Sequence, residues 1–104
     1  LPSVFISSVA NDIPAQRAKV LAATQRPVAA GALSETLITA PAWKTIPSWY
    51  EVGTIDKVIP AVQQTLMAQR AHARIVIERT GHLPMISEPR AVTRLIETAA
   101  RTSS

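Results

Sequence analysis

Asp56 and His82 are the residues of this 104-residue chain whose types and positions best suit catalytic chemistry. A carboxylate that contacts an imidazole fixes the tautomer of the ring and stabilises its protonated form. The ring can then take a proton from a nucleophile, so the pair would supply the acid and the general base of a triad. Each residue also has a plainer interpretation, because Asp often forms turns and a Gly-His pair often lies in an ordinary loop.

The elements that precede these two residues are expected to bring them together. Aromatic and branched residues over 46–52 predict a strand, and 73–78 predict a second strand whose three successive branched residues are typical of cover on both faces. Residues 60–72 carry apolar side chains at helical spacing. The order strand, helix, strand favours parallel pairing, so Asp56 and His82 would lie in loops that leave the same edge of the sheet.

Other segments are expected to surround this unit. Residues 14–24 predict a helix with Asp12 as its cap, and residues 28–42 predict a short helix or an irregular covering segment. A last helix is expected after Ser87, which would cap it, with Pro89 in the opening turn.

Composition narrows the classes of function. Hydrophobic residues make up 47 % and charged residues 17 %, which favours a folded globular piece with no membrane span. The 11 basic residues exceed the 7 acidic ones but are scattered singly, so we expect neither nucleic acid nor membrane as a partner. There is no cysteine, and His72, expected at the end of its helix, is the only histidine besides His82, so no metal or other cofactor is expected.

The start of the chain has neither the basic region nor the apolar core of a signal peptide, which favours a cytoplasmic location. The chain also begins without Met. It is therefore expected to start part-way through a longer protein or after processing.

Several short stretches are specific only in combination, and they are Ala42-Trp43-Lys44, Ile46-Pro47-Ser48-Trp49-Tyr50, Asp56-Lys57-Val58-Ile59-Pro60, Met67-Ala68, Gly81-His82 and Ser87-Glu88-Pro89. Together they resemble the C-terminal part of the α/β-hydrolase family, within its small bacterial esterase-like branch. The stretches Asn11-Asp12-Ile13-Pro14-Ala15 and Gln25-Arg26-Pro27 resemble the part of that branch in which the lid ends.

The resemblance implies an α/β fold in which residues 1–104 form a partial hydrolase domain. Residues 1–42 would be the end of the lid and a connecting helix, and residues 43–104 the last two parallel strands with their helices. Asp56 would be the triad acid and His82 the general base. Packing roles near the strand would fall to three aromatic residues, Trp43, Trp49 and Tyr50.

The chain departs from the family at the nucleophile. The family carries its serine on a Gly-x-Ser-x-Gly elbow that precedes these elements. Here Gly31, Gly53 and Gly81 do not bracket a serine in that way, and neither Ser34 nor Ser48 has the required turn. The segment that would form the oxyanion hole is missing too.

Three functions remain open on the sequence alone. The first is a segment of a serine hydrolase that acts on a carboxylic ester or related acyl bond of a small molecule and is inactive by itself. The alternative is a non-catalytic module that completes its sheet with a partner chain or a second copy, because a two-stranded sheet leaves edges uncovered. The third is an independent small domain with antiparallel strands, which would place Asp56 and His82 far apart.

Overall fold

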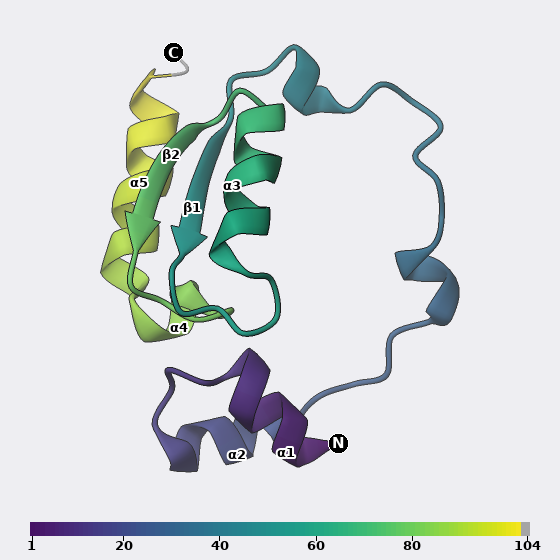
Figure 1. The fold of residues 1–104 in the computed structure, drawn as a ribbon, viewed down its shortest axis with the longest axis vertical. Coiled ribbons are helices and arrows are strands. Elements are labelled where there is room, and N and C mark those ends of the chain that lie inside the picture. Colours follow the sequence, from purple (N-terminus) through teal and green to yellow (C-terminus); the bar gives the residue numbers. More distant parts are fainter. Residues whose placement is uncertain (103–104) are drawn as a thin grey trace.

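The structure is a computed structural model that describes residues 1–102, and its elements run from N to C as Figure 1 shows. They are α1 (Pro2–Val4), a π-helical stretch (Phe5–Val9), α2 (Ala15–Ala23), 3-10 turns at Ala30–Leu33 and Ala42–Lys44, β1 (Trp49–Gly53), α3 (Ala61–Arg70), β2 (Arg74–Glu78), α4 (Pro84–Ser87) and α5 (Pro89–Thr102).

The two strands pair in parallel, with a register that runs from Trp49 opposite Arg74 to Gly53 opposite Glu78. The chain passes from β1 to β2 through α3, and α3 and α5 flank the strand pair (Figure 1). This arrangement confirms the α/β fold with parallel strands and shows that the antiparallel alternative is wrong. β1 begins at Trp49 rather than at 46, after Pro47, which lacks the N–H that a strand ladder needs.

β2 is more exposed than its sequence suggested. Ile75 is 38 % exposed, Val76 36 % and Ile77 68 %, so the expectation that both faces of this strand are covered is wrong for residues 1–102. The physical reason is that the sheet of the described chain has only two strands, with one long helix on either side of the pair in Figure 1. Each strand therefore keeps an unpaired outer edge within this part of the chain.

The N-terminal residues form a small helical layer at the carboxyl ends of the strands (Figure 1). Its core consists of Ala10, Ile13 and Ala18, against which Phe5 and Ile6 pack. The helical turns before residue 14 were not predicted, because such short segments have little helical stability by themselves and depend on tertiary packing. The helix predicted over 14–24 is present as α2.

Both predicted helix caps are wrong. Pro14 occupies the cap position of α2, while the Asp12 carboxylate accepts a hydrogen bond from the distant Gly81 N–H. Ser87 lies inside α4, a short helix that was not predicted, and its hydroxyl donates to the Leu83 carbonyl at 3.4 Å. Each side chain therefore makes a different hydrogen bond from the predicted cap, Asp12 with a residue far along the chain and Ser87 with the preceding turn of its own helix.

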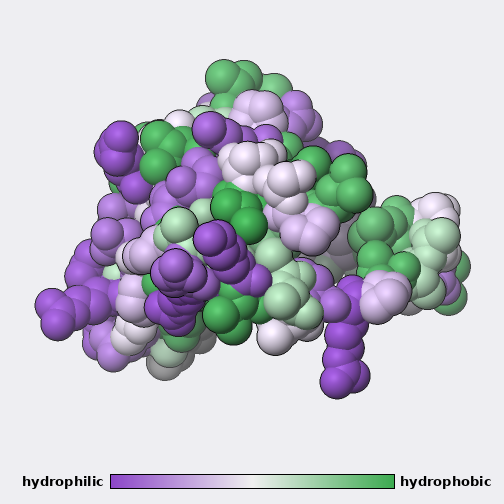
Figure 2. Space-filling model, turned by 90° about the horizontal axis from the view of Figure 1, so that it is seen from below, coloured by the Kyte–Doolittle hydropathy of each residue, from purple (hydrophilic) through white to green (hydrophobic). Residues whose placement is uncertain are grey.

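Residues 25–48 form a long, mostly exposed connection that leads from α2 to the start of β1 (Figure 1), as the irregular alternative for 28–42 predicted. Trp43 attaches the connection to α3, because its ring lies 5.6 Å from the Arg70 guanidinium carbon. The molecule seen from below, in Figure 2, shows hydrophobic and hydrophilic residues interspersed. No helix within residues 1–102 combines the length and the apolar character needed to cross a membrane.

Candidate active site

The loops that follow β1 and β2 run side by side at the carboxyl edge of the sheet. The Thr54 N–H donates to the Glu78 carbonyl at 2.9 Å and the Ile55 N–H donates to the Thr80 carbonyl at 3.2 Å, so the ladder continues past the strand ends. Gly53 suits this close approach, since a Cβ atom there would lie 2.8 Å from the Thr80 carbonyl oxygen. The two loops are thereby held close enough for their side chains to meet.

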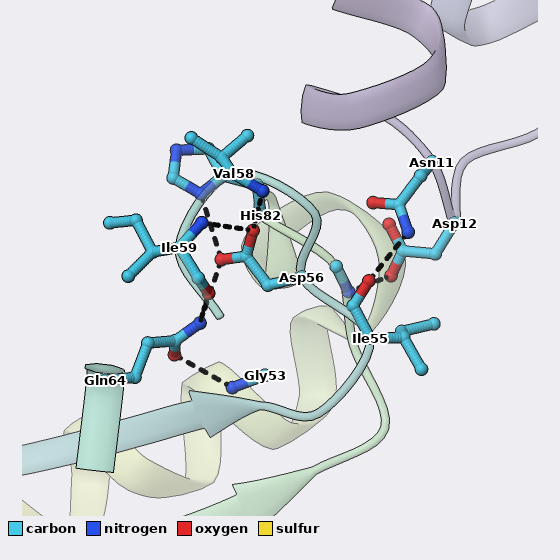
Figure 3. Close-up of polar contacts among 10 residues, drawn as sticks. Asn11, Asp12, Gly53, Ile55, Asp56, Val58, Ile59, Gln64 and His82 are labelled. Carbon is cyan, nitrogen blue, oxygen red and sulfur yellow. Dashed lines mark hydrogen bonds and ion pairs between the residues drawn. The ribbon is translucent and has the colours of Figure 1, made fainter. Parts of the chain in front are cut away.

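The Asp56 carboxylate is buried, with only 5 % of the side chain exposed, and it accepts four hydrogen bonds. Oδ1 accepts from the backbone N–H groups of Val58 at 2.7 Å and Ile59 at 3.1 Å, which is the pattern of a turn-forming aspartate. Oδ2 accepts from Gln64 at 2.9 Å and lies 3.0 Å from His82 Nδ1. Oδ1 therefore forms the turn, and Oδ2 makes the contact with His82 that the catalytic hypothesis requires (Figure 3).

His82 faces Asp56 through its Nδ1 atom. An ionised carboxylate has no proton to donate, so the proton of this hydrogen bond must sit on Nδ1. In the neutral ring, Nε2 is then the atom that can accept a proton. No hydrogen bond to Nε2 is present within residues 1–102, and 31 % of the His82 side chain is exposed. The arrangement leaves the basic nitrogen available to another group.

The charge state of Asp56 is set by opposing effects. Burial alone would raise the pKa of its carboxyl, but the hydrogen bonds from His82, Val58 and Ile59, together with the charge of a protonated His82, lower the pKa below its ordinary value of 3.8. Asp56 is therefore ionised at neutral pH, as an acid that orients an imidazole must be.

This lowered pKa predicts a loss of stability in acid. Because the folded chain binds the Asp56 proton less readily than the unfolded chain, the contribution is present above 3.8 and is lost as pH falls through the lower folded-state pKa. Urea unfolding from about pH 5 to about pH 2 should show a steeper loss for the wild type than for Asp56→Asn. Equal slopes for the two proteins would contradict the lowered pKa.

Gln64 is a site residue that the sequence did not reveal. It is 5 % exposed on α3, and its amide nitrogen donates to Asp56 Oδ2 at 2.9 Å and to the Ile59 carbonyl at 2.7 Å. Its amide oxygen accepts from the Gly53 N–H at 3.0 Å (Figure 3). The only sequence signal was a polar residue on the side of α3 that also carries Ala68, which is fully buried. Gln64 thus joins the end of β1, the Asp56 loop and α3.

A cleft of about 330 Å³ lies beside the pair, and Asp56, His82 and Gln64 are among the residues that line it. Tyr50 also lines it, and burial together with the negative charge of Asp56 raises the pKa of that phenol, so it stays neutral. The lining residues include a second carboxyl group, Glu51. Burial raises the pKa of Glu51 and the charges of Glu78 and Glu88 add to this, whereas the neighbouring Thr80 side chain lowers it.

The two tryptophans and the second histidine lie in different parts of the fold. Trp49 lines the same cleft, whereas Trp43 lies on the connection near the end of α3. His72 follows α3 with a φ of 51°, the left-handed conformation that often ends helices. Within residues 1–102 no three His, Asp or Glu side chains are grouped in a way that would hold a metal ion.

The parallel strand pair thus carries Asp56 and His82 on the two loops at its carboxyl edge. The model described as "Alpha/beta hydrolase family" matches residues 2–95, and the chain belongs to that family. A curated relative, the alpha/beta hydrolase nvfD of Aspergillus novofumigatus (strain IBT 16806), is 37 % identical over 67 residues. The matched region covers 62 % of this chain and 27 % of that protein. No solved structure matches the chain.

Proposed function

We propose that the chain supplies the acid and the general base of a serine-type hydrolase that cleaves a carboxylic ester or a related acyl bond of a small molecule. The observation that supports this most directly is the 3.0 Å contact between Asp56 Oδ2 and His82 Nδ1 in a family member, with Nε2 left unbonded within residues 1–102. The finer placement in a small bacterial esterase-like branch rests on the sequence resemblance alone.

In the proposed mechanism each atom of the pair has one role. His82 Nε2 takes the proton of the serine hydroxyl as that oxygen attacks the acyl carbon, and the imidazolium then returns the proton to the leaving oxygen. Asp56 stays ionised, holds Nδ1–H in place and stabilises the positive charge that develops on the ring. In the second half of the reaction, water attacks the acyl-serine ester while His82 takes a proton from the water. The serine oxygen then leaves and receives that proton from His82.

The serine itself is not provided by a Gly-x-Ser-x-Gly elbow in this sequence. We therefore expect the purified 104-residue chain not to hydrolyse a nitrophenyl ester, and a form that also carries the elbow to do so. The measurement is initial-rate hydrolysis by both proteins at equal concentration. Clear turnover by the 104-residue chain that His82→Ala abolishes would place the nucleophile within this sequence and contradict the proposal.

A second candidate is a module that completes its sheet with another chain. It is favoured by the unpaired outer edge of β1 and by the exposure of Ile77 and Ile75 on β2. We expect sedimentation of the purified chain at micromolar concentration to show self-association, or association with a complementary segment. A compact, stably folded monomer would contradict this candidate.

A further inference from the structure

Two neighbouring residues of the N-terminal layer contact both loops of the candidate site. The Asn11 side-chain N–H donates to the Ile55 carbonyl at 2.8 Å, and the Asp12 Oδ2 atom accepts from the Gly81 N–H at 2.7 Å (Figure 3). Ile55 directly precedes Asp56 and Gly81 directly precedes His82. We name this dipeptide, Asn11-Asp12, the clip.

The clip is itself held firmly. The residues on either side of it, Ala10 and Ile13, are 1 % and 7 % exposed and belong to the N-terminal core. Leu83, the residue after His82, packs against that same core. The His82 loop is therefore attached to the N-terminal layer on both sides, by a hydrogen bond at Gly81 and by apolar contact at Leu83.

Gly81 fits the clip too closely to accept a side chain. A Cβ atom at this position would lie 2.5 Å from Asn11 Oδ1 and 2.6 Å from Asp12 Oδ1. Both of these oxygens are buried without a hydrogen-bond partner. Each of the two side chains thus makes its contact with a loop while one of its buried polar atoms stays unpaired. Close packing and short hydrogen bonds together fix the distance between the clip and the His82 loop.

We propose that Asn11 and Asp12 are positioning residues that set the separation of the Asp56 and His82 loops and thereby hold the Asp56–His82 contact. The inference rests on the proposed function for its catalytic meaning, but not for its geometry. A catalytic pair needs its groups held to about half an ångström. The backbone hydrogen bonds between the two loops end at Ile55 and Thr80, and the clip adds a contact to the residue before each member of the pair. One rigid dipeptide that binds the residue before each member supplies such a restraint.

The test is the pKa of Asp56, measured by NMR from the side-chain carboxyl carbon of the purified chain. We expect Asn11→Ala and Asp12→Ala each to raise it measurably toward its ordinary value of 3.8, as the hydrogen bond from His82 weakens. Removing the negative charge of Asp12 would by itself lower the pKa of Asp56, so the sign separates positioning from a charge effect. Asp12→Asn keeps an oxygen that can accept from Gly81 and should leave the pKa low.

Ile13→Val is the control for stability, because it weakens the same core without touching a clip hydrogen bond. It should lower the free energy of unfolding and leave the pKa of Asp56 unchanged. If Asn11→Ala does not fold, Asn11→Ser provides the same readout. An Asp56 pKa that stays low in the Ala variants, or that rises equally in Asp12→Asn or Ile13→Val, would overturn the proposal. The titration does not depend on ester hydrolysis, so it can fail or succeed independently of the proposed function.

Discussion

In a form of the protein that joins this chain to a serine nucleophile, His82→Asn is expected to lower kcat/KM for a nitrophenyl ester by a factor on the order of 10⁵ to 10⁶. The reason is that the serine would lose the base that takes its proton, while binding and any oxyanion hole would remain. Asp56→Asn should cost about 10⁴-fold, because an amide that donates to Nδ1 favours the wrong tautomer of the ring.

The chain offers a matched control in its other histidine. His72 is exposed and has a φ of 51°, a conformation that Asn tolerates well, so His72→Asn makes the same chemical change away from the cleft. We expect it to leave kcat/KM within about twofold of the wild type. Equal losses for the His72 and His82 variants would point to a general loss of folding rather than to a missing base.

Gln64→Leu is expected to have the largest effect on stability, about 3 kcal/mol, measured as the free energy of unfolding in urea. Leucine has a similar size but would leave the Gly53 N–H and the Ile59 carbonyl without the partners they have in the wild type. Each buried polar group that loses its partner costs about 1–3 kcal/mol. This is a large share of a typical total of about 5–15 kcal/mol.

Gln63→Leu serves as the comparison, because Gln63 precedes Gln64 on α3 and is exposed. It should change the free energy of unfolding by less than about 0.5 kcal/mol. Gln64→Glu adds a second check, since it replaces the donor to Asp56 with a carboxylate and should destabilise the chain more at neutral pH than in acid. If Gln64→Leu is as stable as Gln63→Leu, the hydrogen bonds of Gln64 do not contribute as described.

The Asp56–His82 pair could be predicted from the sequence, but the residues that contact its two loops could not. Asp56 and His82 each follow a short strand at an equivalent place, and parallel pairing brings such loops to one edge whatever the remaining details. The Asn11 and Asp12 contacts span 44 and 69 residues, so no local pattern indicates them. Asp12 instead matched a helix-cap pattern that the fold does not use.

The exposure of β2 could not be predicted from its own residues. Its branched residues are typical of a covered strand, and that preference is a property of the side chains alone. Whether cover is present depends on how many elements the folded chain places around the strand, and residues 1–102 place only β1 beside it in the sheet. Tertiary packing likewise explains the π-helical stretch, because its Phe5 and Ile6 pack against the N-terminal core.

The most direct test of the account is a double-variant cycle on Asp56 and His82 in the form that carries the nucleophile. If the 3.0 Å contact makes the two residues one catalytic unit, Asp56→Asn should cost nothing further once His82 is Asn. We predict that kcat/KM of the double variant lies within about threefold of that of His82→Asn alone. Losses that multiply, so that the double variant is about 10⁴-fold worse than His82→Asn, would show that the two residues act separately and contradict the account.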